Sequence, residues 1–379
     1  MTVEKLDGTS PRLYALVAPL VMRRSVLRQN NNYPFWTSRS HTWFVAWEGE
    51  IVFGFVPVEI TDGGIAKINN YYVSGDDPRL KTVFEAFDNV YVSFSGGKDS
   101  GVLLNLCIDY IRRYGLKRRI GVFHMDYEIQ YRDTLSYVDR MLASNPDILD
   151  VYRVCVPFKV PTCASMFQRY WRPWEEGKRE LWVRAMPAGS YTRGSFPFFS
   201  EEMWDYEFQN RFAEWLHRRC GATRTCCLIG IRTQESFNRW RTIYSDRNHH
   251  RFEGRRWIRQ WADAGICNAY PIYDWLTTDV WTANGRFGWP YNRLYDLFHR
   301  AGVPLDTQRV ASPFISQALS SLHLYKAIDP DMWGRMIGRV NGVNFAALYG
   351  RTSALGWQSA RLPKGLTWER YMHFLLATL

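Results

Sequence analysis

The stretch that most constrains this chain is a short glycine-containing loop between an apolar segment and a helical one. Residues Asn89 to Phe94 are mainly β-branched and aromatic, which is typical of a buried strand. The loop Ser95-Gly96-Gly97-Lys98-Asp99-Ser100 follows directly. In the next segment, Asp99 to Tyr114, apolar residues recur at the spacing of one helical face. A strand that passes into a helix through such a loop predicts an α/β fold.

The alternation of strands and helices continues beyond this loop. Further strand-like segments occur at Arg119 to His124, Val151 to Val156 and Thr225 to Ile231. Helical segments lie between them, at Tyr131 to Ala143 and Glu201 to Arg219. Strands that alternate with helices favour a parallel twisted sheet with helices on both faces.

The pattern before this alternation predicts a separate N-terminal unit. A helix is expected over Ser10 to Arg28, and a hairpin with strands Thr42 to Trp47 and Ile51 to Ile60 turns at Glu48-Gly49-Glu50. This region resembles the central hairpin of acyltransferases that use acetyl-coenzyme A, but it is too short for that fold, so a structural β-appendage is expected. The predicted boundaries are 1–80 for the N-terminal α+β appendage, 81–325 for the main domain with an insertion at about 160–200, and 326–379 for a C-terminal helical segment.

The loop has the chemistry that phosphate binding requires. Gly96 and Gly97 let the backbone approach a ligand, and the unpaired amides of a helix N-terminus point at an anion. Lys98 adds a positive charge, the two serines add hydroxyl donors, and Asp99 can cap the helix or hold magnesium. The spacing is not the Walker pattern. The alternative is a small turn with an ordinary cap, but the coincidence of strand, loop and helix favours phosphate binding.

The loop resembles the signature of the PP-loop ATP pyrophosphatases, and residues 88–320 resemble the phosphoadenosine phosphosulfate reductase-like branch of that superfamily. Three further stretches are similar to this branch, in the same order: Gly121 to Asp126, with Thr134 in the following helix; Ile229 to Ser236, with Arg239; and Pro271 to Trp281, with Tyr291 to Tyr295. The resemblance implies an adenine nucleotide alpha hydrolase-like fold, with ATP and Mg²⁺ as ligands.

The resemblance also implies which residues form the site. The catalytic set is Lys98, Asp99, Asp126, Arg232 and Arg239; the nucleotide-binding set is Ser95, Gly96, Gly97, Lys98, Ser100, Asp126, Gly230 and Glu235; and Asp99 is the candidate Mg²⁺ ligand. Asp126 ends a strand, where ligands of open α/β sheets bind. Arg232 and Arg239 suit bidentate phosphate contacts, although Arg232 can instead pair with Glu235. Asp274 and Asp279 are explained equally well as caps of a helix near Thr277.

The cysteines separate this chain from the sulfonucleotide reductases it resembles. Those enzymes use a cysteine close to the C-terminus, whereas no cysteine follows Cys267 here, and the seven cysteines form no C-x-x-C pair. We therefore expect neither that reductase mechanism nor an iron–sulfur cluster. Cys226 and Cys227 lie in an apolar strand and are interpreted as packing residues, and Cys163 is the candidate reactive thiol. With no signal segment or membrane-spanning stretch, the expected compartment is the cytoplasm.

The net charge of +11 indicates attraction to polyanions. Arg251, Arg255, Arg256 and Trp257 combine guanidinium and indole groups, which suit phosphate contact and base stacking. A basic surface without a nucleic-acid partner has the same composition, and aromatic residues are abundant throughout, so both interpretations stay open.

The resemblance implies an ATP pyrophosphatase that forms AMP and pyrophosphate and so activates an acceptor for sulfur insertion. Its similarity to the ATP pyrophosphatases of DNA phosphorothioate modification points to DNA as the acceptor, with a cysteine desulfurase or another sulfur donor protein as partner and no membrane. The segment Tyr170 to Pro187 resembles an insertion of a subgroup that includes proposed transcriptional regulators. The alternatives are therefore sulfonucleotide metabolism and a nucleotide-binding regulator without turnover, although an intact Lys98 and Asp99 favour turnover.

Overall fold

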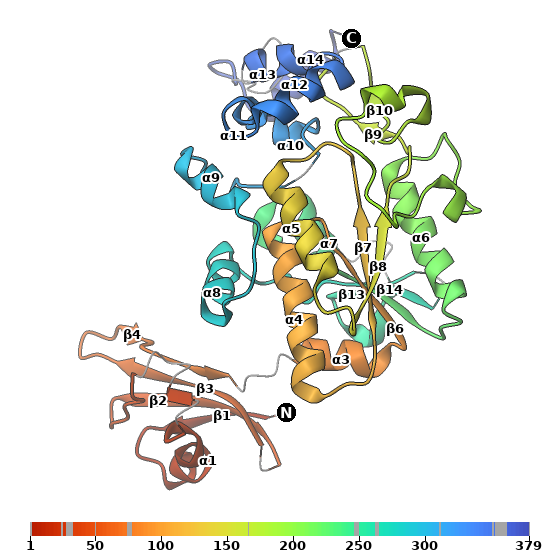
Figure 1. Ribbon diagram of the computed structural model, residues 1–379. Coiled ribbons are helices and arrows are strands. Elements are labelled where there is room, and N and C mark those ends of the chain that lie inside the picture. The colour runs from red at the N-terminus through yellow and green to blue at the C-terminus, as the bar shows by residue number, and fades with distance from the viewer. Residues whose placement is uncertain are drawn as a thin grey trace. The chain divides into compact units, whose positions relative to one another are not determined.

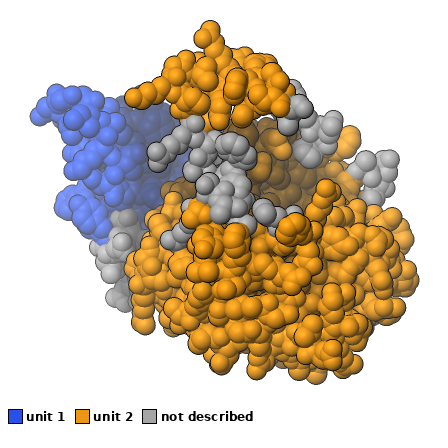
Figure 2. All heavy atoms as spheres, turned by 90° about the horizontal axis from the view of Figure 1, so that it is seen from above, with its two compact units in different colours: residues 1–82 blue, residues 83–379 orange. Residues whose placement is uncertain are grey.

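The computed structural model describes residues 2–23, 26–27, 33–49, 51–73, 78–165, 167–245, 250–261, 265–310, 312–350, 352 and 362–378. The chain divides into two compact units, residues 1–82 and residues 83–379, which Figure 2 colours separately. The division falls within helix α3, Pro78–Ala86. None of the helices in the ranges just given is long and apolar enough to cross a membrane.

The N-terminal unit is an antiparallel sheet that shares a small core with one helix. Its elements are β1 (Thr2–Asp7), α1 (Pro11–Val21), β2 (His41–Glu48), β3 (Ile51–Ile60), β4 (Ala66–Lys67) and β5 (Tyr72–Val73). The strand order is β1-β2-β3-β4, and β5 also pairs with β3. Leu13 and Val17 of α1 belong to the same buried cluster as Trp43 and Phe55. The predicted hairpin is present as β2 and β3; Glu50 and Arg28 lie outside the described residues.

The second unit is built on a seven-stranded sheet (Figure 1). The strand order is β12-β13-β14-β11-β6-β7-β8, and the bounds are β6 (Asn89–Ser93), β7 (Ile120–Met125), β8 (Leu149–Val154), β11 (Thr225–Ile229), β12 (His250–Arg251), β13 (Ile258–Gln260) and β14 (Ile266–Ala269). The five strands from β14 to β8 are parallel, which confirms the predicted α/β class. The edge strands β12 and β13 run antiparallel, because a short connection can return the chain only as a hairpin.

Helices cover both faces of this sheet, as the alternation predicts (Figure 1). The main ones are α4 (Lys98–Tyr114), α5 (Arg132–Ala143) and α6 (Asp205–Arg219). Phe212 of α6 packs against Tyr91, with ring centroids 5.8 Å apart. Successive strand residues point to opposite faces. The neighbours of Tyr91, Val90 and Val92, are buried on the other face, where α4 and α5 lie.

The remaining helices and strands of this unit complete the set of elements around the sheet. They are β9 (Val160–Pro161), β10 (Tyr170–Trp171), α7 (Phe237–Tyr244), α8 (Thr277–Phe287), α9 (Leu294–Arg300), α10 (Ser316–Leu319), α11 (Tyr325–Ile328), α12 (Pro330–Arg339), α13 (Val343–Tyr349) and α14 (Trp368–Leu376).

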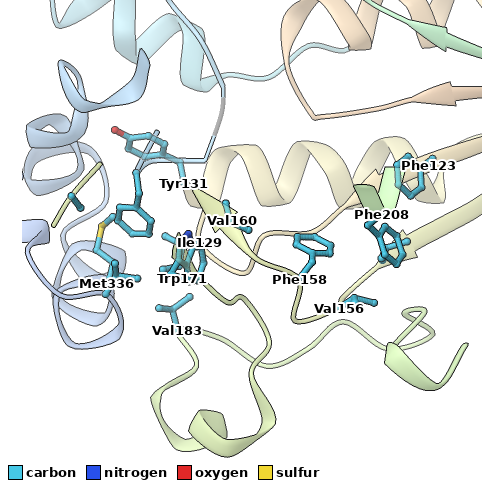
Figure 3. Packing of buried hydrophobic residues seen from close by; sticks show 14 of the residues in the cluster. Phe123, Ile129, Tyr131, Val156, Phe158, Val160, Trp171, Val183, Phe208 and Met336 are labelled. Carbon is cyan, nitrogen blue, oxygen red and sulfur yellow. The ribbon is translucent and has the colours of Figure 1, made fainter. Parts of the chain in front are cut away.

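The main core runs continuously from the sheet into the insertion and the C-terminal helices (Figure 3). Phe123 of β7 and Phe208 of α6 belong to the same buried cluster as Trp171 of the insertion and Met336 of α12. Removal of this apolar surface from water stabilises the fold at about 25 cal/mol per Å². The insertion and helix α12 are therefore part of the core of the second unit and do not merely lie on its surface.

Candidate functional site

The loop between β6 and α4 lies where the order of strands reverses. From β6 the chain adds β7 and β8 on one side and later adds β11 on the other. Ligands of open α/β sheets bind at such a switch point, beyond the carboxyl ends of the strands. Two pockets occur there. One, of about 460 Å³, faces β11, and we call it the loop pocket; the other, of about 230 Å³, faces β7, and we call it the Asp126 pocket.

The backbone of the loop is held in a conformation that glycine favours. Gly96 has a φ of 77°, and a Cβ atom there would lie 2.7 Å from Val138 Cγ2. The Ser95 hydroxyl accepts a hydrogen bond from the Gly97 amide at 3.3 Å and lies 3.1 Å from the Ser100 hydroxyl. The loop is therefore shaped before any ligand arrives.

Gly230 brings the end of β11 against the first turn of α4. A Cβ atom at this position would lie 2.9 Å from the carbonyl carbon of Asp99. Because backbone atoms form that contact, a larger residue would have to push the strand and the helix apart. Gly230 therefore shapes the wall of the loop pocket, which it lines together with Lys98 and Asp99.

Lys98 lies at the start of α4 and is held on two sides. Its ammonium group pairs with Asp99 Oδ2 at 3.0 Å and donates to the Gln308 carbonyl at 3.4 Å. Its backbone amide donates to the Tyr295 hydroxyl at 3.0 Å. Burial lowers the pKa of Lys98, and the neighbouring Asp99 carboxylate opposes that effect. Because burial disfavours the charged form of Lys98, an anion that binds beside it would stabilise that charge.

The predicted arginines take two different positions. Arg232 is buried behind the pocket, where its Nε lies 2.5 Å from Asp99 Oδ1, and its Nη2 lies 3.9 Å from Glu235. Arg239 lines the pocket and pairs with Glu235. Burial lowers the pKa of Arg239, and the nearby Arg309 lowers it further. Arg232 thus holds Asp99, whereas Arg239 faces the space where a ligand would bind.

Arg309 is a pocket residue that sequence reasoning missed. It lies in the segment after α9, far from the loop in sequence and outside any recognised motif. Its Nη2 donates to the Glu235 carbonyl at 2.7 Å, and its side chain lines the loop pocket beside Arg239. No pattern in the sequence marks it, because only the folded chain brings it to the site.

Asp126 belongs to the second pocket, and both of its oxygens are already bonded. Arg153 Nε lies 3.1 Å from Oδ2, Arg184 bonds Oδ1, and the Glu128 amide donates to Oδ1 at 3.0 Å. Burial alone would raise the pKa of Asp126, but Arg184, His124 and Arg153 outweigh it and lower the pKa. The structure thus places this predicted nucleotide-site carboxylate within a closed ion-pair cluster.

Glu128, two residues further on, ties three parts of the chain together. Its carboxylate accepts hydrogen bonds from the backbone amides of Trp174 at 2.8 Å and Val183 at 3.2 Å. Arg339 of α12 pairs with it through Nε at 2.9 Å and Nη2 at 3.1 Å. Both side chains are almost fully buried. The end of β7, the insertion and the C-terminal helices are therefore joined through one buried ion pair.

The remaining predicted polar residues have local partners. Asp279 caps α8 by accepting from the Leu276 amide at 2.8 Å, as the capping interpretation predicts. Asp274 is exposed. Thr134 lines the Asp126 pocket and accepts from Asn292 Nδ2 at 2.9 Å.

The three singled-out cysteines lie in two environments. Cys226 and Cys227 are buried in β11, and burial raises the pKa of Cys227 to about 12. This agrees with their interpretation as packing residues. Cys163 is exposed in the segment after β9, and it lines neither of the two pockets at the carboxyl edge of the sheet.

The predicted nucleic-acid cluster falls at the antiparallel edge of the sheet. Arg255 pairs with Glu253, Arg256 lies 5.0 Å over the ring of Tyr244, and Arg251 and Trp257 are half-buried. Arg259 of the neighbouring strand β13 donates to three backbone carbonyls, those of Thr242, Ile243 and Ser245.

A magnesium ion fits the loop pocket only together with a phosphate ligand. Within the described parts of the chain, no three His, Cys, Asp or Glu side chains converge as a metal site. Asp99 is the carboxylate of the loop itself and lines this pocket, and Lys98 and Arg232 each pair with one of its oxygens. Mg²⁺ commonly binds through one or two carboxylates together with substrate phosphates and water, so Asp99 suffices as the protein ligand.

Comparisons with known proteins place the site in a family context. The sequence model of the phosphoadenosine phosphosulfate reductase domain matches residues 89–173, and that of a domain of unknown function (DUF3440) matches residues 302–379. The uncharacterized protein YbdN of Escherichia coli K12 is 32% identical over 305 residues, which cover 79% of this chain and 73% of that protein.

Similar solved structures share low sequence identity with this chain. A phosphoadenylyl-sulfate reductase of Candida auris, in a phosphate complex, is 15% identical, with 58% of this chain and 83% of that chain covered and a TM-score of 0.32. An FMN adenylyltransferase of Candida glabrata in complex with ATP is 16% identical, with 58% and 56% covered and a TM-score of 0.33. The U34-tRNA thiolase NcsA of Methanococcus maripaludis, with its [4Fe-4S] cluster, is 8% identical, with 71% and 77% covered and a TM-score of 0.32.

Proposed function

Because this chain belongs to the PP-loop ATP pyrophosphatase superfamily, in its phosphoadenosine phosphosulfate reductase-like branch, we propose that it cleaves ATP between the α and β phosphates. The products are AMP and pyrophosphate, or an adenylated acceptor and pyrophosphate. The superfamily consists of nucleotide-utilizing enzymes, and the sequence model of the reductase-like domain covers β6, the loop and β7.

The observation that carries this proposal is the convergence of positive groups on one pocket. Lys98, Arg239 and Arg309 line the loop pocket together with the N-terminal turn of α4. Amides at a helix N-terminus and fixed guanidinium groups stabilise phosphate oxygens without reorganisation during reaction. The pocket volume of about 460 Å³ is within the range of ordinary ligand sites.

The two pockets together fit a nucleotide. They share Ser93, Ser95 and Val310, so they adjoin at the end of β6. A nucleoside in the Asp126 pocket would direct its phosphates across Ser95 to the cationic side. In that pose Asp126 shapes the wall of the nucleoside pocket through its ion pairs with Arg153 and Arg184, and Lys98 contacts the phosphates directly.

The residues of the loop pocket divide the chemistry of phosphoryl cleavage among them. Lys98 and the positive N-terminal end of α4 hold the phosphates that leave as pyrophosphate, and Arg239 and Arg309 offset the negative charge that develops on them. Arg232 fixes Asp99, which orients Lys98 and is the protein ligand for Mg²⁺. When bound, Mg²⁺ neutralises phosphate charge.

We further propose that the activated acceptor receives sulfur and that this acceptor is DNA, as in phosphorothioate modification. The net charge of +11 supports a polyanionic acceptor. On this proposal a cysteine desulfurase or another donor protein supplies the sulfur, the reaction takes place in the cytoplasm, and the reductase mechanism with its iron–sulfur cluster is not used.

The test is release of pyrophosphate from Mg-ATP, measured with and without DNA. We expect release that requires Mg²⁺ and that rises when DNA is added. Release that DNA does not change would leave ATP cleavage standing and would remove DNA as the acceptor. Absence of release under both conditions would contradict the enzymatic proposal and favour a nucleotide-binding regulator.

A further inference from the structure

Helix α7 carries an exposed ladder of aromatic rings that the proposed reaction does not use. Phe237, Trp240 and Tyr244 recur at helical spacing and lie on one face. The ring centroids of Phe237 and Trp240 are 5.8 Å apart with an interplanar angle of 14°, and those of Trp240 and Tyr244 are 5.0 Å apart at 17°. We call these three residues the α7 ladder.

The ladder is exposed to a degree that packing does not explain. Phe237 is 71% exposed, Trp240 45% and Tyr244 37%. Its side chains contribute little to a core, since the only buried residue of α7 is Ile243. An exposed aromatic ring with an open face, supported from behind by further stacked rings, is a surface on which a nucleic-acid base can stack.

The two ends of the ladder differ. At the Tyr244 end the guanidinium of Arg256 lies 5.0 Å over the ring, so a cation closes the stack. At the other end Phe237, in the described part of the chain, stacks on Trp240 alone and leaves its outer face open. Ser236 and Asn238, the neighbours of Phe237, line the loop pocket. The open end of the ladder is thus the end at the proposed reaction site.

The charge around the ladder suits a nucleic-acid strand. Arg241 is exposed on α7 between Trp240 and Tyr244 in sequence, and Arg256 is exposed at the closed end. Guanidinium groups beside the ladder can contact backbone phosphates while a base lies on the open face of Phe237. Only unpaired bases can offer their faces in this way, because bases in a duplex are stacked on one another.

From this geometry we infer that the α7 ladder binds an unpaired stretch of DNA, whose leading base stacks on Phe237 beside the loop pocket. The inference deepens the proposed function, because it rests on DNA as the acceptor and names the surface that presents it. The two are separable by experiment, since base stacking is measured without ATP and pyrophosphate release is measured without DNA.

The experiment is fluorescence anisotropy with a labelled oligothymidylate of about 12 nucleotides, a length within the usual range for such sites. The variants are Phe237→Ala and Trp240→Ala. The control is Phe287→Ala in α8, which removes a ring whose 56% exposure lies between those of Phe237 and Trp240. Phe287 stacks on Trp289 and lies beside Arg286 but lines neither pocket.

We expect Phe237→Ala to weaken binding by about tenfold, the usual effect of losing one stacked base, and the control to leave it unchanged. Trp240→Ala should also weaken binding, because Trp240 supports the ring of Phe237 from behind. Trp240→Phe should restore most of the affinity. The salt dependence should stay as in the wild type, since no charge is removed. Pyrophosphate release without DNA should also be unchanged in Phe237→Ala.

Three results would overturn the inference: no binding of the oligonucleotide by the wild type, equal losses in the ladder variants and the control, or equal affinity for a duplex of the same length. If the ladder variants lose binding while the wild type releases no pyrophosphate, the inference stands and the enzymatic proposal fails.

Discussion

Asp99 and Asp126 occupy comparable places in the sequence but have different surroundings. Each follows a central parallel strand at the carboxyl edge of the sheet. The Asp99 side chain is 13% exposed at the wall of a cationic pocket, whereas that of Asp126 is 1% exposed and is enclosed by Arg153 and Arg184. The first carboxylate lies within reach of a ligand, and the second supports the structure around the site.

The difference shows that residues at one edge of the sheet have two roles: some line the proposed reaction site, and others stabilise the structure around it. The loop pocket keeps cations whose charge is only partly offset, and these bind an anion favourably. Beyond β7, Asp126 and Glu128 instead use their charges to fix the insertion and α12. Substitutions on the two sides should therefore affect different measurements: turnover at the loop pocket, and stability beyond β7.

The largest effect is expected from Arg339→Met, which leaves Glu128 buried without its partner. Loss of one member of a buried ion pair costs about 3 to 5 kcal/mol of unfolding free energy. Urea unfolding followed by circular dichroism measures it. The control is Arg293→Met, which breaks the exposed pair with Asp296 and should leave the stability nearly unchanged. Equal losses in both variants would contradict the supporting role of Glu128.

Asp126→Asn should destabilise the protein by about 2 to 3 kcal/mol at neutral pH, because charge-assisted hydrogen bonds to two arginines are lost. The pKa of Asp126 is lowered in the folded state, so its contribution is present above the pKa of the unfolded chain and is lost as pH falls through the folded value. Unfolding of both proteins across a pH series should therefore show a difference that shrinks in acid. If the difference in unfolding free energy did not change with pH, the stabilisation could not come from the ionised form of Asp126.

Lys98→Ala should lower ATP affinity or turnover at least tenfold, about 1.4 kcal/mol, with little change in stability, since Asp99 keeps Arg232 as a partner. Calorimetric titration with Mg-ATP measures the affinity, and circular dichroism checks the fold. An unchanged ATP affinity and turnover rate in a folded variant would contradict a role of Lys98 in ATP binding.

The smallest effect concerns pH. Burial lowers the pKa of Lys98 below its ordinary value of 10.5, so the free enzyme loses this charge at a lower pH than an exposed lysine would. ATP affinity should then fall a few-fold as pH rises through that lowered pKa, because the phosphates lose a positive partner. Lys98→Arg, which stays charged, should remove the decline. If ATP affinity fell by the same factor in that variant, the titrating group would be a residue other than Lys98.

Much of the fold could be predicted from the sequence because its signals are local. The apolar run before Ser95 and the periodic helix after it predicted β6 and α4, and the later alternation predicted β7, β8 and β11 with only small shifts of their ends. The fifth parallel strand, β14, was not predicted. The antiparallel edge was not predicted, since β12 and β13 are too short to show a periodic pattern.

The site was only partly predictable for the same reason. The loop residues are contiguous, so their chemistry is visible in the sequence. Tertiary packing alone brings Arg309 to the pocket, and Arg184 and Arg339 to their carboxylate partners. The sequence spacing of these arginines does not indicate their roles. The pattern around Asp126 indicated a nucleotide-site carboxylate, but the two arginines that enclose it come from β8 and the insertion.

The most direct test of the central claim is the identity of the products formed from ATP labelled in its α phosphate. The purified protein is incubated with the labelled nucleotide and Mg²⁺, with and without DNA, and the products are separated by ion-exchange chromatography. Our account predicts that the label appears in AMP, or in DNA carrying an adenylate, with pyrophosphate released in equal amount. Label recovered as ADP with free phosphate would contradict cleavage between the α and β phosphates.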